Sequence, residues 1–337
     1  MENIIRISDI EAFNSLLSKT KKVAIFTHVN PDGDALGSAL TFQMALRKRK
    51  IASEIFIANR VPESLTWMPG AKSIKHNASK TELDAYLKTA DLIACLDFNE
   101  PGRMDQLAYV LENPPLPVLV LDHHPQVKEY EGLQIASTRY SSTAELLFWI
   151  LKESDNLPLT REVASCIYTG IVTDTGSFSY NASSSATFMA VAELLEIGFD
   201  KDRITELVFQ QFAASRMKLL GHMLANRMVI IPEYRTAYTY LTRKDLADYN
   251  YQPGDTEGFV NYPLSVAGIK FTAFFIEKAE YVKISFRSKG NFAANEFSTQ
   301  FFNGGGHLNA AGGKSHKNLS DTLKEFEEKV KAYYHEF

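Results

Sequence analysis

Residues 23–38, VAIFTHVNPDGDALGS, decide the fold because they lead from an apolar strand through a polar turn into a helix. Short apolar runs of the same kind return further along the chain, and stretches with helical spacing separate them. Such alternation is typical of βαβ units and of a mostly parallel sheet. The sequence therefore predicts an α/β fold in which helices flank a sheet of strands at 23–27, 54–58, 92–96 and 118–121.

The turn in this stretch holds three side chains that commonly bind metals, His28, Asp32 and Asp34. Pro31 and Gly33 bend the backbone, so the imidazole and both carboxylates can converge on one point. Either carboxylate alone could instead cap the helix that follows, because Asp is a common capping residue. A helix cap has no use for the histidine, so the set of three favours a metal site.

Polar residues also follow other predicted strands at the points where these strands end. Asp97 follows the third strand, and Asp122-His123-His124 follow the fourth. A further acid, Asp174, lies in the run TDTGSF. Ligands of parallel sheets gather at the carboxyl ends of the strands. Each residue taken alone has a structural alternative, since the acids could cap turns and the histidines could be packed or solvated.

Taken together, the chain offers one set of candidate metal ligands: His28, Asp32, Asp34, Asp97, His123 and Asp174. Carboxylates and imidazoles without a thiolate suit Mn²⁺ or Mg²⁺ better than Zn²⁺ or Co²⁺. Four carboxylates are too many for one ion, whereas two ions about 3.5–4 Å apart that share one carboxylate would use them all. Such a pair activates water for an in-line displacement at phosphorus, so the ligand set predicts hydrolysis of phosphate esters.

Composition limits the function classes. The 337 residues are 45% hydrophobic and 23% charged, which is ordinary for a globular protein. A net charge of −4 argues against adhesion to long duplex nucleic acid but permits a small phosphorylated substrate. Cys95 and Cys166 lie in apolar segments and fit buried thiols in a reducing compartment. We expect a cytoplasmic protein, because no apolar run approaches the ~18–20 residues of a membrane span and the N-terminus does not resemble a signal peptide.

The chain is long enough for two domains, because a single core seldom grows past ~250–300 residues. The α/β pattern covers residues 1–200. Residues 201–226 have helical spacing and are interpreted as a helical linker. Alternating apolar runs and a closing helix then predict a second, smaller α/β domain with a mixed sheet at 227–337.

Five motifs in this order resemble the DHH phosphoesterase superfamily with its DHH-associated C-terminal domain. They are HVNPDGDA, the strand end at Asp97, DHH at 122–124, TDTGSF at 173–178 and GGGHLNAAG at 304–312. The DHH triplet alone is a weak signal, but five ordered motifs are specific and span nearly the whole chain. The FRSK and GGGH segments are most similar to the bacterial branch that includes nanoRNases and 3′-phosphoadenosine 5′-phosphate (PAP) phosphatases.

The resemblance implies two metal sites that share one bridging carboxylate. One site would be formed by His28, Asp32 and Asp97. The other would be formed by Asp34, Asp97, His123 and Asp174. His124 would face the scissile phosphate, and Asp122 would orient the imidazoles from behind.

The resemblance also implies that the C-terminal domain binds the end of the substrate distant from the metals, through Arg287, Ser288, Gly305, Gly306 and His307. Glycines let backbone N–H groups approach a phosphate closely, and an arginine can bind phosphate through two parallel hydrogen bonds. A flexible loop is the alternative for the glycine-rich segment. Arg103 is a further candidate phosphate contact, although a solvated arginine explains it equally well.

The sequence thus predicts a two-metal phosphoesterase that holds its substrate in a cleft between domains. A cleft of fixed span favours short single-stranded RNA or PAP. Hydrolysis of cyclic di-adenylate or its linear product is an alternative, since the same metals would serve. The resemblance also admits a homodimer.

Other functions fit less well. A pyrophosphatase has no use for a nucleotide-binding domain, and a processive exonuclease would need a basic channel that this short, acidic chain does not suggest. A nucleotide sensor that has lost its chemistry is an alternative of another class. Such a sensor predicts a damaged ligand set, whereas all six positions are filled.

Overall fold

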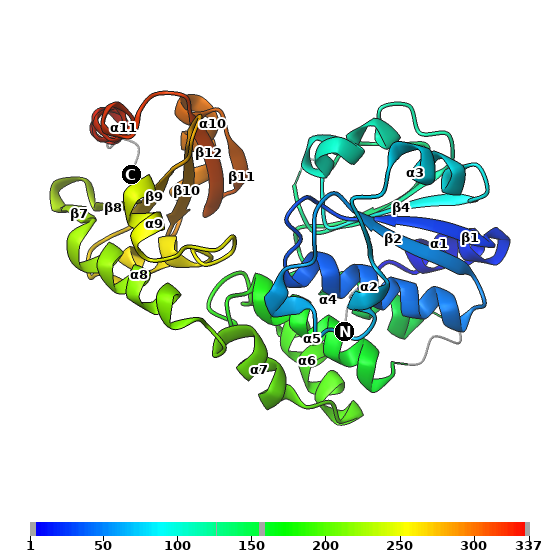
Figure 1. Cartoon of the computed structure of the whole chain (residues 1–337). Helices are drawn as coiled ribbons and strands as arrows, with labels where there is room; N and C mark the ends of the chain where they lie inside the picture. The colour runs from blue at the N-terminus through cyan, green and yellow to red at the C-terminus, as the bar shows by residue number, and fades with distance from the viewer. Residues whose placement is uncertain (1–4, 126, 155–158, 334–337) are drawn as a thin grey trace. The chain divides into compact units, whose positions relative to one another are not determined.

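The structure is a computed structural model that describes residues 5–125, 127–154 and 159–333. The chain divides into two compact units, Met1–Gln211 and Phe212–Phe337, each of which contains one sheet (Figure 1). The division lies inside the segment predicted as a linker. There, α7 (Lys201–Phe209) belongs to the first unit and α8 (Ala214–Asn226) to the second.

The first unit is built on a six-stranded sheet in the order β3-β2-β1-β4-β5-β6, and every strand pair in it is parallel. Its strands are β1 Lys22–Phe26, β2 Ala52–Ile57, β3 Lys75–His76, β4 Leu92–Leu96, β5 Val118–Asp122 and β6 Gly132–Ala136. Its other helices are α1 Ile7–Lys19, α2 Gly33–Lys48, α3 Lys80–Leu87, α4 Thr143–Glu153, α5 Arg161–Asp174 and α6 Ser185–Ile197. The predicted α/β fold is confirmed. The two outer strands, which are short or partly exposed, were not predicted.

Helices cover both faces of this sheet because successive side chains of a strand point to opposite faces. Val23 and Ile25 of β1 join the core beneath α1, α2, α4 and α5. Ala24 and Phe26 join the core beneath α3 and the 3₁₀ segment Pro101–Leu111. Figure 1 shows α2, α4 and α5 on one side of the sheet and α3 on the other.

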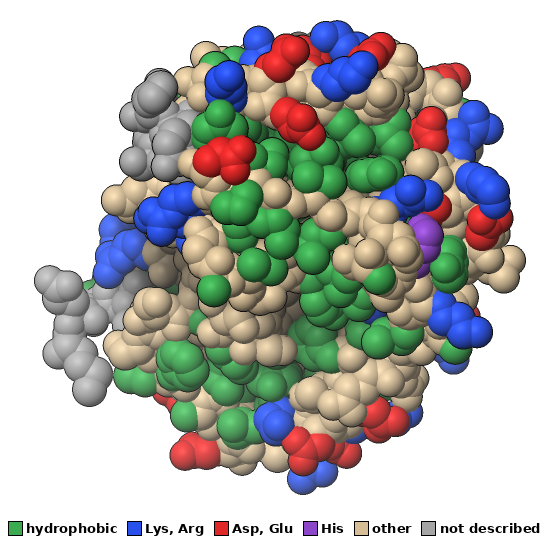
Figure 2. All heavy atoms as spheres, turned by 90° about the vertical axis from the view of Figure 1, so that its left-hand side faces the viewer, with side chains coloured by type: hydrophobic (Ala, Val, Ile, Leu, Met, Phe, Trp, Pro, Cys, Tyr) green, Lys and Arg blue, Asp and Glu red, His purple; other side chains and the backbone are tan. Residues whose placement is uncertain are grey.

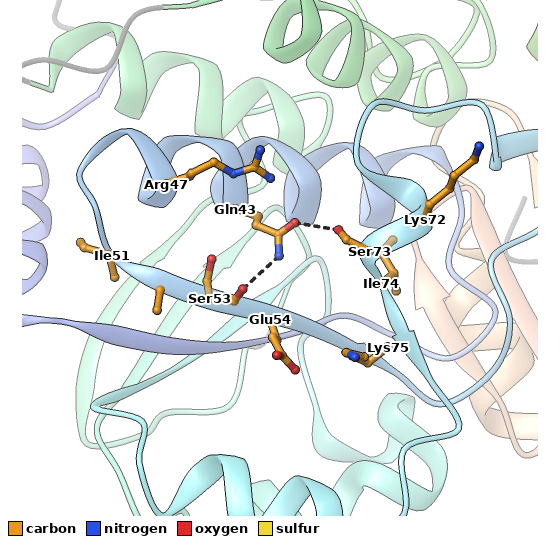
Figure 3. Close-up of a pocket in the computed structure, with 10 residues that line it drawn as sticks. Gln43, Arg47, Ile51, Ser53, Glu54, Lys72, Ser73, Ile74 and Lys75 are labelled. Atoms are coloured by element: carbon orange, nitrogen blue, oxygen red, sulfur yellow. Dashed lines mark hydrogen bonds between the residues drawn. The ribbon is translucent and has the colours of Figure 1, made fainter.

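Helix α2 carries the first predicted ligands, and contacts along its length hold it against neighbouring segments. Its first half packs closely on α5, where a Cβ at residue 37 would lie 2.5 Å from the backbone oxygen of Cys166. Toward its other end, Gln43 donates to the carbonyl of Ser53 at 3.2 Å and accepts from the hydroxyl of Ser73 at 3.3 Å (Figure 3). These contacts fix the position of the helix relative to the sheet.

The second unit contains a mixed six-stranded sheet in the order β11-β12-β10-β9-β8-β7. Its strands are β7 Met228–Ile231, β8 Thr236–Leu241, β9 Phe271–Glu277, β10 Val282–Ser288, β11 Gly305–His307 and β12 Ala310–Ser315. Besides α8, its helices are α9 Arg243–Asp248, α10 Ala294–Phe302 and α11 Leu319–Tyr333. Only the β8–β9 pair is parallel among the described pairs, so the predicted mixed sheet is confirmed.

Both faces of the second sheet are buried by aromatic and aliphatic side chains. Phe271 and Phe275 of β9 pack with Phe326 of α11, whereas Phe274 packs on the opposite face with Leu219 of α8.

Figure 2 shows hydrophobic side chains gathered across the middle of one molecular face, with charged side chains mostly toward its rim. The centre of that face is therefore apolar rather than positively charged. Among the described residues, none of the helices combines the length and apolar character needed to span a bilayer.

Candidate metal centre

The loop after β1 positions the first two candidate ligands. Asp32 is the N-cap of α2, and its Oδ1 accepts hydrogen bonds from the backbone N–H groups of Asp34 and Ala35, both at 3.0 Å. Its other oxygen, Oδ2, lies 3.8 Å from the Nε2 of His28. Asp32 therefore caps the helix and faces the candidate metal position at the same time, so the two interpretations of this residue are compatible.

His28 has the tautomer that a metal ligand needs. Its Nδ1 lies 2.9 Å from the carbonyl oxygen of Val29, and because a carbonyl only accepts, Nδ1 carries the proton. In the neutral ring the buried Nε2 holds the lone pair, and it has no hydrogen-bond partner in the described part of the chain. It points instead toward Asp97, whose Oδ2 is 3.5 Å away. A cation between these atoms would satisfy both.

His123 faces three carboxylates. Its Nε2 lies 3.5 Å from Asp97 Oδ1, 3.6 Å from Asp174 Oδ2 and 3.9 Å from Asp34 Oδ2. These side chains come from the ends of β4, β5 and α5 and from the first turn of α2. Asp97 adopts a positive φ of 66°, a strained backbone conformation that is common at functional sites. The strand ends therefore do converge on one place.

Potential ligand atoms fall into three overlapping groups in which all atoms lie within 4.8 Å of one another. The groups are His28, Asp32 and Asp97; Asp34, His123 and Asp174; and Asp97, His123 and His124. Every residue predicted as a metal ligand is among them. Asp97 connects the groups because one oxygen faces His28 and the other faces His123.

Electrostatics in the cluster are unfavourable without a cation. Burial, followed by repulsion from Asp97 and Asp174, raises the pKa of Asp34 well above its ordinary value. Burial, followed by repulsion from Asp32, does the same to the pKa of Asp97. Desolvation raises the pKa of Asp32, but His28, backbone N–H groups and Arg103 outweigh it and lower the pKa overall. Divalent cations would relieve the repulsion among these acids, so the donor set fits metal ions.

Asp122, His124 and Arg103 form a hydrogen-bonded chain beside the cluster. The Oδ1 of Asp122 lies 2.7 Å from the Nδ1 of His124, and the Nε2 of His124 lies 2.9 Å from the Nη1 of Arg103. Burial is the largest influence on His124 and lowers its pKa, with Arg103 and His123 adding to the effect and Asp122 opposing it. The structure thus brings Arg103, which the sequence treated as equally consistent with a solvated position, into the site.

The candidate substrate contacts of the second unit lie around the β10–β12–β11 end of its sheet. Ser288 is buried, donates to the carbonyl of Phe292 at 2.7 Å and accepts from Asn309 at 2.8 Å, so its hydroxyl already has partners. Gly305 and Gly306 belong to the edge strand β11 rather than to a flexible loop. Arg287 lies on β10, and His307 ends β11, although its side chain lies outside what the structure describes.

The sequence did not identify the residues that support the cluster from behind. The backbone N–H groups of Thr143 and Ala144 donate to the two oxygens of Asp34 at 2.7 and 2.8 Å. The hydroxyl of Thr143 donates to Asp97 Oδ1 at 3.0 Å. The run S-T-A-E at 142–145 has the form of a helix start, and nothing in it indicates a contact with the metal cluster.

A hollow of about 570 Å³ lies away from this cluster. Figure 3 shows that it is lined by side chains from α2, by the beginning of β2 and by the segment Lys72–Lys75. The candidate ligands lie near the opposite, carboxyl ends of the strands, and none of them lines it. Although this hollow is large, it contains none of the candidate ligands, so we do not assign it as the catalytic site.

The fold and the site define the class as phosphate ester hydrolases. Residues 22–171 match the DHH family, N-terminal domain, and residues 234–336 match the DHHA1 domain. The chain therefore belongs to the DHH phosphoesterase superfamily and carries a DHHA1 domain in its C-terminal part, as the sequence motifs predicted.

Individual proteins support this assignment. The chain is 26% identical over 292 residues to the bifunctional oligoribonuclease and PAP phosphatase NrnA of Bacillus subtilis, covering 86% of this chain and 88% of that protein. A solved exopolyphosphatase-related protein from Bacteroides fragilis has a TM-score of 0.93 and 36% identity, covering 99% of this chain and 98% of that one. The exonuclease RecJ bound to manganese shares the fold, with a TM-score of 0.54, 18% identity and coverage of 99% and 96%.

Proposed function

We propose that this chain hydrolyses short oligoribonucleotides and PAP with the help of two divalent metal ions, Mn²⁺ in the first place and Mg²⁺ or Co²⁺ as substitutes. The observation that carries the proposal is the position of Asp97, whose two oxygens face His28 and His123 at 3.5 Å each. One ion would be held by His28, Asp32 and Asp97. The other would be held by Asp34, Asp97, His123 and Asp174.

Bound metals would supply a nucleophilic water at neutral pH and positive charge beside the phosphate. The protein's own residues would stabilise the developing charge and orient the groups around the metals. Arg103 lies beside the cluster, where the N–H groups that it does not donate to His124 would stabilise the charge that develops on the phosphate. His124 would hold this arginine in place by accepting its hydrogen bond. Asp122 holds the His124 ring in place through the Nδ1 hydrogen bond. These assignments make the acids and histidines of the first unit responsible for the chemistry.

The second unit is proposed to bind the substrate end distant from the metals. The backbone of β11 lies at the edge of its sheet, and edge strands present unpaired N–H groups to a ligand. Arg287, Gly305, Gly306 and His307 are the proposed contacts. Ser288 is proposed to act mainly by fixing the end of β10, because its hydroxyl already bonds Phe292 and Asn309. The name of the Bacillus subtilis relative supports short RNA and PAP as the substrates.

A rate profile tests the proposal. Purified protein would be incubated with oligoribonucleotides of increasing length and with PAP, with and without Mn²⁺, after removal of metals by a chelator. We expect Mn²⁺-dependent turnover that is fastest for the shortest RNAs, and no turnover by Asp97→Asn. The exposed acid Asp202 gives a matched control, Asp202→Asn. Full activity of Asp97→Asn would refute the mechanism.

The same assay separates the alternatives. Faster turnover of cyclic di-adenylate than of the linear dinucleotide would make the cyclic compound the substrate. Tight nucleotide binding without any hydrolysis in Mn²⁺ would identify a sensor. The site favours the enzyme, because the ligand groups described above are complete.

A further inference from the structure

The first residues of α4 contact two carboxylates of the cluster at once. The N–H groups of Thr143 and Ala144 hold both oxygens of Asp34 at 2.7 and 2.8 Å. The Thr143 hydroxyl also donates to Asp97 Oδ1 at 3.0 Å. Thr143, Ala144 and Asp34 are fully buried, and Asp97 is 2% exposed. Water therefore does not replace these hydrogen bonds, and their geometry fixes where the carboxylates point.

The hydroxyl of Thr143 is not needed to start the helix. The N-cap of α4 is Ser142, whose Oγ accepts from the N–H of Glu145 at 3.0 Å. Thr143 follows as the first helical residue, where the side chain has no capping task. Its hydroxyl is directed to a carboxylate 46 residues earlier in the chain instead.

A buried carboxyl group holds this segment in place from behind. Glu145 Oε2 accepts from the N–H and the hydroxyl of Ser141 at 2.8 and 2.6 Å and from the hydroxyl of Thr187 at 2.9 Å. Its Oε1 lies 3.4 Å from the indole nitrogen of Trp149. Glu145 is fully buried. The loop before α4 is thus tied to α4 and to α6, and Thr143 has little freedom to move.

We propose that Thr143 is a positioning residue that sets the rotation of the Asp97 carboxylate so that each of its oxygens faces one metal site. The bonded oxygen, Oδ1, faces His123, which leaves Oδ2 directed at His28. Rotation of this carboxylate would turn a bridging ligand into a ligand of one site only. The inference rests on the metal centre proposed above and adds a residue that controls it.

The alternative is a purely structural role, in which Asp97 merely provides a partner for a buried hydroxyl. The two roles differ in what Thr143→Val changes, because valine keeps the branched shape and removes only the hydroxyl. A structural role predicts lower stability with unchanged metal binding. A positioning role predicts weaker metal binding, which serine, with its hydroxyl, should largely restore.

A matched control exists in the same unit. Thr41 lies in α2, is fully buried, and its hydroxyl has no hydrogen-bond partner in the described part of the chain. Thr41→Val therefore makes the same chemical change at equal burial without touching the cluster. It should leave metal binding unchanged.

The test measures Mn²⁺ binding to the metal-free full chain without substrate, by calorimetry and by loss of the free-Mn²⁺ electron spin resonance signal. We expect Thr143→Val to weaken binding by about 10- to 100-fold, the usual effect of removing a group that orients a metal ligand. Thr143→Ser should stay close to wild type. If the valine variant does not fold, Thr143→Ala carries the same test.

The outcomes separate this inference from the proposed function. If the wild-type chain binds no Mn²⁺, the metal centre fails and the inference fails with it. If the wild type and Thr41→Val bind Mn²⁺ and Thr143→Val binds equally well, the metal centre stands and only the positioning role is refuted. Failure of Thr143→Ser to restore binding would also refute it.

Discussion

Arg103 and His124 are hydrogen-bonded to each other, with Nη1 of the arginine 2.9 Å from Nε2 of the histidine. A guanidinium group only donates, so this ring nitrogen accepts and carries no proton. The other ring nitrogen, Nδ1, then carries the proton and donates to Asp122 Oδ1 at 2.7 Å. Arg103 therefore sets the tautomer of His124 and places a positive charge beside the candidate metal centre.

Replacement of Arg103 tests whether this charge serves the reaction. We expect Arg103→Met to lower kcat/KM for a short oligoribonucleotide by about 10- to 100-fold, because a hydrogen bond to a charged group contributes about 1.5–3 kcal/mol. Arg103→Lys should restore only part of the loss, since lysine lacks the planar fork. Arg47→Met, an exposed residue of the hollow in Figure 3, is the control. Unchanged kinetics of Arg103→Met would make Arg103 a bystander.

Gly170 tests the close contact between α5 and the residues around Asp34. A Cβ at this position would lie 2.5 Å from the Cβ of Ala144 and 2.8 Å from Asp34 Oδ1. We expect Gly170→Ala to lower the free energy of unfolding by about 1–3 kcal/mol, as overpacking usually does, and to weaken Mn²⁺ binding by displacing the carboxylate.

A second helical glycine gives the control for this prediction. A Cβ at Gly221, inside α8, would meet nothing within 4 Å. Gly221→Ala should therefore raise stability by about 0.5–1 kcal/mol, because alanine is the better helix former. Thermal unfolding of both variants, with and without Mn²⁺, shows whether Gly170→Ala lowers the stability while Gly221→Ala raises it. Equal effects would mean that the contact at Gly170 is not tight.

Residues that follow strands could be predicted as parts of the candidate site, whereas residues that reach it only through helix packing could not. The convergence of His28 and Asp97 could be predicted because each lies just after the end of a strand, and parallel strands bring their carboxyl ends to one edge. Asp32 could be predicted because it ends the turn that leads from β1 into α2. Thr143 could not be identified in the same way, because it contacts Asp34 across 109 residues and its local sequence only indicates a helix start. Contacts of this kind depend on how α2 and α4 pack, which no local pattern records.

The glycine-rich segment near the end of the chain shows a second limit of predicting structure from local sequence. β11 and β12 consist largely of glycine and alanine, which lack the branched side chains that mark strands. They form strands because β12 pairs with β10 over six residue pairs and β11 pairs with β12. Composition alone therefore left a flexible loop open as an alternative for this segment, whereas tertiary pairing produced an edge strand.

Asp245 predicts a pH dependence of stability in the second unit. Arg227 donates to both of its oxygens at 3.0 Å, and the N–H of Thr242 donates at 2.9 Å. Burial raises the pKa of Asp245, but the bonds from Arg227 and Thr242 outweigh it and hold the pKa well below its ordinary value. A lowered pKa means that the stabilisation is complete above the ordinary value of about 3.9 and is lost as the pH falls further.

The test is urea denaturation of the full chain at neutral pH and near pH 3. At neutral pH we expect Asp245→Asn to lose about 2–3 kcal/mol, below the 3–5 kcal/mol typical of a fully buried pair, because Arg227 is partly exposed. The difference from wild type should shrink at acid pH. Asp248→Asn on the same helix removes an exposed pair with Lys244 and should stay within about 0.5 kcal/mol. A deficit that does not depend on pH would contradict the assignment.

Arg287 tests the proposal that the first unit carries out the chemistry and the second unit binds the substrate. Arg287 of β10 pairs in register with Ala310 of β12, which pairs in turn with His307 of β11, so the three residues form one row across the sheet. A contact with the distant end of the substrate is made equally in the ground state and the transition state, and its loss raises KM without changing kcat. We expect Arg287→Ala to raise KM for PAP and short RNA by about 10-fold or more, the value of one charged hydrogen bond.

Lys283 provides the matched control for Arg287, because it is an exposed cation four residues earlier on the same strand. Lys283→Ala should leave KM unchanged if the effect belongs to a defined contact, and should match Arg287→Ala if only general positive charge matters. Steady-state kinetics at saturating Mn²⁺ separate kcat from KM in both variants. An equal fall of kcat and kcat/KM in Arg287→Ala would place this arginine in the transition state, and binding and chemistry could then no longer be assigned to separate units.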